Sequence, residues 1–513
     1  MKVRDILRPG ALLLCLICVA SAGAQELPAF GFGDGADDVP ALAPAALPLA
    51  LRLSGQAEAA VTVYADEVDR FNKALSYNAG QLFSGSLTFD AVSDHAEASI
   101  VLAIDPAADQ AVSIDEGFVR SYFGKLNLEA GLRTLTWGRV DSEGPLDVLN
   151  PLDYSDLSVT DQMARKIARP VVKASWPLAS FTRLEAVFLP GFEANRLALD
   201  GRWAQAGLAD LSAQLQTGAS AAIEATLAAM VAGGLLNPAG SPEQVAAFYA
   251  TQESLANSVG TSLAAIGESG AAVFFPDTER LAYAQYGLRL TTTAGSHDLG
   301  FQYFYGNRRN PAVSVDQASL FHAQINPLDP ESSTIAFNPS AISLSYDRYH
   351  QVGIDWATVL AGFNLRSELA LNLTDDLSGD DPKVANPAVL WALGFDRSLP
   401  ANLSLNMQGS GSVRLMHDKL GSAPLDAEAD SSRTESRLIS RLSRAFFRDE
   451  LELSFTWIWG VEDADWYALP ELRWSRADTE IGLRAGFFGG SRLGALGQYR
   501  DNTWVSAHMS YFF

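Results

Sequence analysis

The sequence predicts an all-β fold: a transmembrane up-and-down antiparallel β-barrel of about 18 strands, with 16 as the alternative. Three observations support this prediction. Apolar and polar residues alternate along many segments, the links between these segments are alternately short and long, and many of the segments run to about ten residues. A tilted strand needs about that length to cross a bilayer, whereas strands of soluble sandwiches are shorter.

The alternation is clearest in two segments. LELSFTWIWG (451–460) is apolar at every odd position, and Glu452, Ser454 and Thr456 lie between. The chain ends on NTWVSAHMSYFF, in which every odd position from Val505 to Phe513 is apolar. Because side chains alternate across a strand, such a segment has one apolar and one polar face. An antiparallel sandwich gives the same period, so a secreted all-β protein is the alternative.

The predicted strands and their links fit the barrel better than the sandwich. The strands cover 51–65, 80–92, 95–105, 112–124, 126–138, 169–176, 181–190, 282–294, 297–306, 343–361, 363–375, 387–398, 401–417, 432–446, 449–461, 466–475, 479–488 and 502–513. Every second link is short, including SDH, GK, AGSHD and FRD, and most of the others are long, near 139–168, 191–281, 307–342, 418–431 and 489–501. Membrane barrels have short periplasmic turns and long external loops, so we expect that orientation here.

The first residues predict export from the cytoplasm. Lys2, Arg4 and Arg8 precede the apolar run ALLLCLICVA, and small residues follow at 22–24, which is typical of a signal peptide over 1–24. Residues 25–50, rich in Pro, Ala and Gly, predict an extended periplasmic lead-in, and 51–513 the outer-membrane barrel. No stretch has the length of a helical membrane span. Both cysteines lie at positions 15 and 18, so the mature chain has no disulfide.

The charge balance argues against a nucleic-acid partner. The chain has 37 Lys and Arg against 60 Asp and Glu, and removing 1–24 gives 34 minus 59, a net charge of −25. Much of the excess lies in the lead-in and in loop stretches such as DDLSGDDPK and DAEAD. The expected partners are outer-membrane lipid, lipopolysaccharide, the barrel-assembly machinery and a small solute.

The stretch LEAGLRTLTWGRVDSEGPLDVLNPLDYSDL resembles a motif of a large family of porin-like outer-membrane proteins known as a domain of unknown function. Trp137, Gly138, Asn150, Pro151 and Asp153 stand at the positions of its Trp-Gly and Asn-Pro-x-Asp motifs. The following ARPVVKASWPLASFTRLEAVFLP is similar to the family's Pro-bearing strand and hairpin. The resemblance covers roughly 126–205 and implies passage or binding of a solute, without an established substrate.

The same loop has a structural interpretation. Asn-Pro favours a turn, and Asp153 can accept a hydrogen bond from nearby backbone. The alternative is that the loop folds into the lumen and takes part in function.

The polar faces of the predicted strands are the candidate pore lining. They carry the arginines Arg133, Arg289, Arg366, Arg414, Arg437, Arg441, Arg473 and Arg484 and the glutamates Glu129, Glu368, Glu435, Glu452, Glu471 and Glu480. Charged rings bias which ions pass a pore, and a guanidinium binds carboxylate or phosphate through two bonds. One hypothesis is a channel favouring anionic solutes, led by Arg133, Arg366 and Arg437. The alternative is that these arginines pair with the glutamates and stiffen the lumen.

The link 191–281 predicts a helical insertion at about 205–268. SPEQ begins a helix, with Ser241 as cap, Pro242 at the first position and Gln244 completing a capping box. An earlier run, ASAAIEATLAAMVAGG, predicts a helix that ends at Gly233 and Gly234. The insertion could plug the lumen, cover its mouth or contact a partner.

The final strand has a second predicted role. An alternating terminal strand ending in an aromatic residue, here with Tyr511 and Phe513, resembles the signal that barrel proteins present to their assembly machinery. We also expect this strand to pair with the first one, because a barrel in lipid must satisfy all of its backbone groups.

Catalysis finds little support in the sequence, and no cofactor or metal site is expected. The six histidines lack helical metal-pair spacing, and Asp375, Asp376, Asp380 and Asp381 lack the spacing of a calcium loop. The function expected first is a porin-like channel for passive or facilitated diffusion of small polar solutes. The second is a plugged barrel serving as an adhesin or structural protein, and the third is an outer-membrane barrel hydrolase with a serine and histidine brought together.

Overall fold

The computed structural model describes residues 49–69, 72–78, 82–108, 110–198, 201–269, 275–420, 428 and 431–513. The predicted signal peptide 1–24 and nearly all of the lead-in 25–50 lie outside the described residues. The chain divides into two units, Met1–Leu47 and Pro48–Phe513, and every described residue belongs to the second. Within this described part, no helix is long and apolar enough to cross a membrane.

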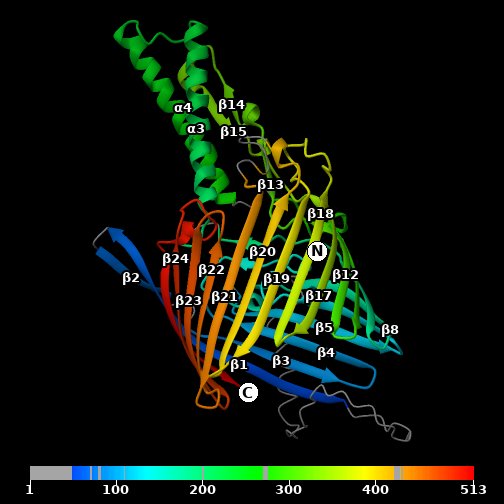
Figure 1. Ribbon diagram of the computed structural model, residues 1–513. Helices are drawn as coiled ribbons and strands as arrows, with labels where there is room; N and C mark the ends of the chain where they lie inside the picture. The colour runs from blue at the N-terminus through cyan, green and yellow to red at the C-terminus, as the bar shows by residue number, and fades with distance from the viewer. Residues whose placement is uncertain are drawn as a thin grey trace, which may run out of the picture. The chain divides into compact units, whose positions relative to one another are not determined.

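Eighteen antiparallel strands form a closed barrel, because the last strand pairs with the first (Figure 1). Each of the other strands pairs with its neighbours along the chain, as an up-and-down barrel requires. The strands are β1 (Ala50–Asp69), β3 (Ser84–Val92), β4 (Ala96–Ile104), β5 (Val112–Phe123), β6 (Leu126–Arg133), β8 (Arg169–Ala179), β9 (Thr182–Leu189), β11 (Gln285–Ala294), β12 (His297–Asn307), β17 (Arg348–Leu360), β18 (Phe363–Thr374), β19 (Ala388–Leu399), β20 (Leu403–Arg414), β21 (Thr434–Phe446), β22 (Leu451–Gly460), β23 (Asp465–Arg476), β24 (Thr479–Gly489) and β25 (Thr503–Phe512).

The first strand has three partners along its length. β1 pairs with β3 through 50–58, with β25 through 56–65 and with the additional strand β2 (Asn72–Asn78) through 62–69. β2 thus extends the sheet beyond the closed ring, so the sheet has 19 strands and the barrel 18. The predicted fold class is confirmed, and each predicted strand corresponds to one barrel strand.

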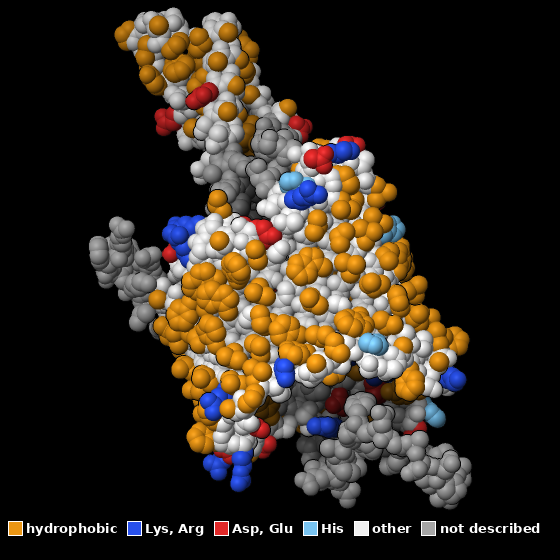
Figure 2. Space-filling view, in the orientation of Figure 1, with side chains coloured by type: hydrophobic (Ala, Val, Ile, Leu, Met, Phe, Trp, Pro, Cys, Tyr) orange, Lys and Arg blue, Asp and Glu red, His pale blue; other side chains and the backbone are white. Residues whose placement is uncertain are grey.

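Alternation gives the barrel an apolar outer face and a polar inner face. On β22, Leu453 and Phe455 are 51% and 45% exposed, whereas Ser454 between them is 3% exposed. A broad apolar band covers the outside in Figure 2. Aromatic pairs lie near both ends of the strands, including Trp457 stacked on Trp466 with ring centroids 4.9 Å apart. An apolar band of this extent, with aromatic residues at its edges, is typical of a surface in contact with lipid.

Two predicted strands run past the observed boundaries. The segment 343–361 contains β16 (Ile342–Ser345), which belongs to a separate small sheet, as well as β17 of the barrel. The segment 126–138 was expected to be one strand, but β6 ends at Arg133 and the chain then turns into the barrel. Leu135 and Trp137 are buried there, in an apolar cluster with Val187 and Phe304 on the inner wall. The alternation resumes past Arg133 with its phase reversed, from apolar even positions up to Leu132 to apolar odd positions from Leu135. This reversal was a local signal for the end of the strand.

The predicted helical insertion is present between β9 and β11. It consists of α3 (Ala206–Ala232) and α4 (Pro242–Ser269). Ser241 and Gln244 form the expected capping box: the Ser241 N–H donates to Gln244 Oε1 at 2.9 Å, and the Gln244 N–H donates to Ser241 Oγ at 3.4 Å. Gly234, just after α3, has a φ of +74°, which favours glycine.

The helices pack on a hairpin from a different loop. β14 (Phe321–Gln324) and β15 (Thr334–Phe337) belong to the link between β12 and β17, and we call these two strands with α3 and α4 the head. Met230 and Leu255, both fully buried, pack with Ile335 in the apolar core of the head. The shorter elements are β7 (Asp153–Tyr154), α2 (Gln162–Arg165), β10 (Arg196–Leu197), β13 (Ala312–Val315), β16 (Ile342–Ser345) and the 3-10 turns at Leu281–Tyr283, Gln317–Ser319, Pro330–Ser332, Pro339–Ala341, His417–Lys419 and Gly497–Tyr499.

Candidate functional site

The loop between β6 and β8, residues 134–168, folds into the barrel. Its base is fixed by Asn150, which is 2% exposed. The Asn150 amide accepts from the Leu135 N–H at 2.7 Å and donates to the carbonyls of Arg133 and Ile167 at 3.0 and 2.8 Å. Asp153 accepts from the Ser155 N–H at 2.9 Å. Asn150 and Asp153 thus make structural contacts, in a loop that also lies in the lumen.

One carboxylate on the inner wall holds the middle of this loop. Glu368 of β18 is 3% exposed, and its oxygens accept from the backbone N–H groups of Arg139, Val140 and Leu146 at 2.5, 2.9 and 3.2 Å. A Cβ added at Gly138, whose φ is +96°, would collide with the Glu368 carboxylate. The glycine of the Trp-Gly motif thus lets backbone approach the carboxylate closely.

A charged network extends this attachment to neighbouring strands. Arg139 Nε lies 2.5 Å from Asp355 Oδ1, and Asp355 Oδ2 lies 2.5 Å from Arg289 Nη2. Gln302 and Gln351 donate to the loop carbonyls of Leu146 and Pro145 at 3.1 and 3.0 Å. The loop is therefore bonded to side chains from β12 and β17 as well as β18, and Arg289 of β11 supports Asp355.

Two glycines on the inner wall make room for loop side chains. A Cβ at Gly287 of β11 would collide with the ring of Trp137. Likewise, a Cβ at Gly353 of β17 would collide with Leu146, which is fully buried. The loop is thus fitted to this wall by shape as well as by hydrogen bonds.

A second segment crosses the barrel beside the first. Residues 191–198 run along the loop, where Asn195 Oδ1 accepts from the Leu152 N–H at 2.9 Å and Arg196 pairs with Asp153 at 2.8 Å. After 199–200, Trp203 lies in an aromatic cluster with Tyr64 of β1, Tyr467 of β23, Phe488 of β24, Trp504 of β25 and Tyr499 of the 3-10 turn Gly497–Tyr499. We call residues 134–168 together with 191–198 and 201–204 the crossbar.

The crossbar also contacts the wall at β23, five strands around the ring from β18. Tyr467 of β23 donates to the Leu157 carbonyl at 3.0 Å. Burial and the nearby Glu143 raise the pKa of the Tyr154 hydroxyl, while the guanidiniums of Arg165 and Arg437 oppose the shift. The crossbar is therefore bonded to β23 as well as to β12, β17 and β18, and its Trp203 contacts the cluster that includes Trp504 of β25, across the ring from β12.

A buried ion pair lies within the crossbar. The Lys166 ammonium is 1% exposed, lies 2.7 Å from Asp147 Oδ2 and donates to Thr136 Oγ1 at 2.7 Å. Burial raises the pKa of Asp147 above the usual carboxyl range, although the positive charge of Lys166 opposes that rise.

Most of the predicted pore-lining charges are in ion pairs. Arg133 lies 2.7 Å from Glu116 and 2.9 Å from Glu129, and Arg366 pairs with Asp141 of the crossbar and with Asp396 at 2.8 Å. The remaining pairs are Arg414 with Glu428 and Glu435, Arg441 with Glu452 and Glu471, and Arg473 with Glu452 and Glu480. These contacts favour the alternative in which the arginines are neutralised and stiffen the wall.

Arg437 and Arg484 differ from the others. Neither forms an ion pair with a described residue, and the buried Nε atom of Arg484 has no hydrogen-bond partner there. On the inner wall, Arg484 is the register partner of Glu471 and Ser506. Among the arginines predicted to line the pore, these two therefore stay available to a solute.

Sequence reasoning missed Arg139, Asp355, Gln302 and Gln351. Arg139 lies in a loop, and its partners come from strands far along the chain. The inward glycines Gly287 and Gly353 were a signal that could have been used, since a strand facing open water has no need of such gaps.

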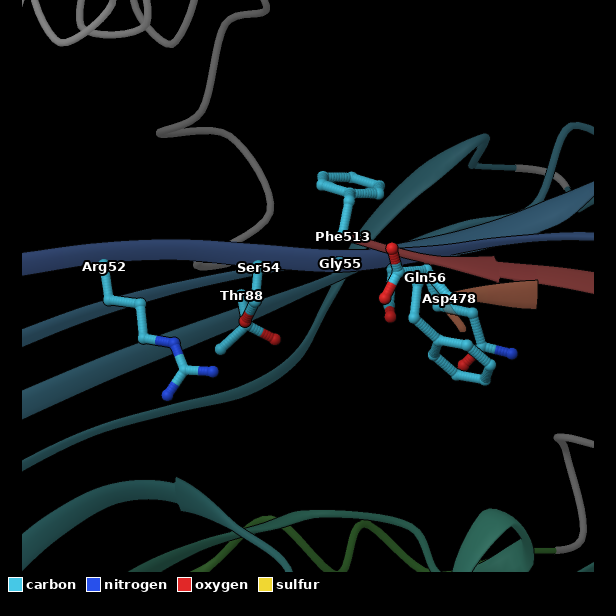
Figure 3. A pocket seen from close by; sticks show the side chains of 9 residues that line it. Arg52, Ser54, Gly55, Gln56, Thr88, Asp478 and Phe513 are labelled. Carbon is cyan, nitrogen blue, oxygen red and sulfur yellow. The ribbon is translucent and has the colours of Figure 1, made fainter. Parts of the chain in front are cut away.

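The C-terminus closes the barrel as expected. The N–H groups of Gly55 and Phe513 each donate to the other's carbonyl, at 2.9 and 3.0 Å. The rings of Tyr511 and Phe513 are exposed on the outer face, with centroids 6.3 Å apart. Figure 3 shows a hollow at this seam, with the Arg52 side chain on one side of β1 and the Phe513 ring on the other.

Histidine, serine and carboxylate side chains of the described residues are the groups from which an enzyme or metal site could be built. In this part of the chain, no histidine hydrogen-bonds to a serine hydroxyl, and no group of three His, Cys, Asp or Glu side chains could hold a metal ion. Asp376 accepts from the N–H groups of Ser378, Gly379 and Asp381, so it organises its own loop.

No family model and no curated protein matches this chain. Solved structures with a similar fold include the outer membrane channel DcaP of Acinetobacter baumannii, at 9% identity, a TM-score of 0.40 and coverage of 91% of this chain and 97% of that one. Pseudomonas aeruginosa OccK11 (OpdR) has 11% identity, a TM-score of 0.42 and coverage of 90% and 96%. Acinetobacter baumannii OccAB3 has 8% identity and a TM-score of 0.43, and the match covers 90% of this chain and 99% of that one. Because the identities and TM-scores are this low, no function is transferred from these proteins.

Proposed function

We propose that this protein is an outer-membrane channel through which small polar solutes diffuse. The observation that carries the proposal is the closed 18-strand barrel with an apolar outer face and a charged inner wall. Barrels of this size are wide enough to enclose an aqueous path. A wall lined by charged side chains offers a solute hydrogen bonds in place of those that it loses to water.

The proposed orientation places the short turns in the periplasm and the long loops, with the head, outside the cell. It follows from the predicted signal peptide and from the usual arrangement of bacterial barrels. Tyr511 and Phe513 would then end the chain on the periplasmic side, as an assembly signal requires.

The crossbar narrows the path and determines which charges a solute meets. Asp141 and Glu143 belong to the crossbar, whereas Arg437 of β21 and Arg484 of β24 belong to the inner wall. Because Arg133 and Arg366 are neutralised by ion pairs, we assign the preference for anionic solutes to Arg437 and Arg484. Their guanidiniums keep the capacity to bind a passing anion.

Two experiments test the proposal. Liposomes containing refolded residues 25–513 should swell in isotonic solutions of small polar solutes, and absence of swelling with a folded barrel would contradict a diffusion channel. In a salt gradient, the reversal potential should indicate anion preference, which should fall in Arg437→Gln/Arg484→Gln. The control Arg492→Gln/Arg500→Gln removes the same charge from outside the barrel wall and should leave the reversal potential unchanged.

A second candidate function has its own observation. The crossbar contacts opposite walls, at β12 through Gln302 and at β25 through the Trp203 cluster, and the head has an apolar core of its own, which suits a closed barrel that presents the head as an adhesin or structural element. Liposomes that do not swell with the wild-type protein, yet swell when Glu368 no longer holds the crossbar, would favour this candidate.

A further inference from the structure

Four arginines lie at the short-turn end of the barrel on one sector of its outer side. Arg397 is near the end of β19, Arg444 is near the end of β21, Arg476 ends β23, and Arg448 lies in the turn after β21. The strand arginines share the outward face with exposed leucines, such as Leu393, which is 55% exposed. Figure 2 shows basic side chains below the apolar band of this face.

These arginines have no ionic partners. None of the four forms an ion pair with a described residue, in contrast to most arginines of the inner wall. The acidic residues of the same region, Asp449, Glu450 and Asp478, lie in the turns, and no ion pair joins them to the arginines. The guanidiniums are therefore available to an anion from outside the protein.

Two of the guanidiniums are held against aromatic rings. The Arg397 guanidinium lies 4.4 Å from the centroid of the Phe363 ring, and that of Arg444 lies 4.8 Å from the Phe446 ring. Aromatic residues at the ends of membrane strands mark the level of the lipid headgroups. Arg397 and Arg444 are thus placed where apolar chains give way to charged headgroups.

The surface between them suits a lipid. Arg397 pairs with Leu405 of β20, and Arg444 pairs with Leu403 of the same strand. The two arginines are separated by two strand spacings, about 10 Å, and Leu403 and Leu405 of β20 lie between them. A headgroup phosphate there would meet guanidiniums on both sides, and the leucines would contact the acyl chains.

Other parts of the same rim are apolar. The outward positions at this end of β1, β5 and β8 and the following turn are Leu51, Phe123, Trp176 and Phe181, which are exposed. The exception is Lys125, in the turn after β5. The basic residues of the rim are therefore concentrated on the β19–β23 sector, whereas generic anchoring would distribute them evenly around the barrel.

We propose that the sector bearing Arg397, Arg444, Arg448 and Arg476 binds the phosphate headgroup of an anionic lipid. The inference rests on the proposed membrane location and is separate from channel activity. A phosphate accepts two bonds from a guanidinium, and cationic side chains near a membrane surface each strengthen binding of anionic lipid. The lipid would belong to the leaflet at the short-turn end.

The test is competition between two phospholipids for the full mature chain. Wild-type protein and Arg397→Gln/Arg444→Gln/Arg476→Gln are equilibrated with equal amounts of phosphatidylglycerol and phosphatidylethanolamine of the same chains, and retained lipids are counted by native mass spectrometry. The wild type should prefer phosphatidylglycerol, and the preference should fall roughly fivefold for each arginine removed. The matched control is Arg433→Gln/Arg492→Gln/Arg500→Gln at the long-loop end.

Equal preference in the wild type and the rim variant would overturn the proposal, as expected if the arginines instead dock a protein. Equal loss in the rim variant and the control would also overturn it, because net charge alone would then explain the effect. Liposome swelling should be unchanged in the rim variant, so failure of the lipid site and failure of the channel can be distinguished.

Discussion

At the scale of single residues, Glu368 decides how the crossbar is held. Its buried carboxylate accepts hydrogen bonds from three backbone N–H groups of the loop, so this attachment does not depend on the loop's side chains. Hydrogen bonds to a charged group are stronger than neutral ones, and a buried donor left without a partner is costly. The contact explains why Gly138 is needed, since a side chain there would displace the carboxylate.

The variant Glu368→Gln should loosen the crossbar while leaving the barrel folded. The amide has one oxygen to accept with, so at least one loop N–H loses its partner, at a cost of about 2 kcal/mol of unfolding free energy. We expect larger fluctuations of the open-channel current in planar bilayers. Glu480→Gln, on an inner-wall residue that contacts Ser475 instead of the crossbar, is the control. Equal current fluctuations in both variants would contradict the conclusion that Glu368 holds the crossbar.

The residues on the inner wall could be read from the sequence, but their pairings could not. Period two places Arg133, Arg366 and Arg437 on one face of their strands. The partner of Arg366 on the crossbar, Asp141, lies 225 residues away, and Arg437 has none among the described residues. Which arginine is neutralised depends on strand register and on the path of a loop, and neither is a local property of the chain.

At the scale of elements, strands and helices were predictable and the crossbar was not. Alternation and length are local signals, as are the capping box at Ser241 and Gln244 and the stop at Gly233 and Gly234. The crossbar has no period, because its residues are fitted to walls built from β11 to β25. Its inward course was one of two interpretations that the Asn-Pro-x-Asp motif left open.

We expect that the head can be destabilised while the barrel stays folded. Leu255→Ala removes a fully buried side chain from the core shared with Met230 and Ile335, and such changes cost about 2–5 kcal/mol. We expect faster chymotrypsin cleavage within α3 and α4, with unchanged heat-modifiability of the barrel. Trypsin is unsuitable, because residues 203–279 contain no Lys or Arg. The exposed Gln252→Ala is the control, and equal cleavage rates would contradict the packing described.

At the scale of the whole molecule, the barrel combines three surfaces with different chemistry. The outer face is apolar and bears unpaired arginines on one rim sector. The inner wall is charged and largely ion-paired, and a crossbar that contacts opposite walls lies within it. A channel requires that the crossbar leave a path, and a structural barrel requires that it leave none.

Single-channel conductance of refolded residues 25–513 in a planar bilayer tests most directly whether the crossbar leaves an open path. We predict steady openings in the wild-type protein, with anion preference that depends on Arg437 and Arg484. A folded, heat-modifiable barrel that shows no openings would contradict the channel.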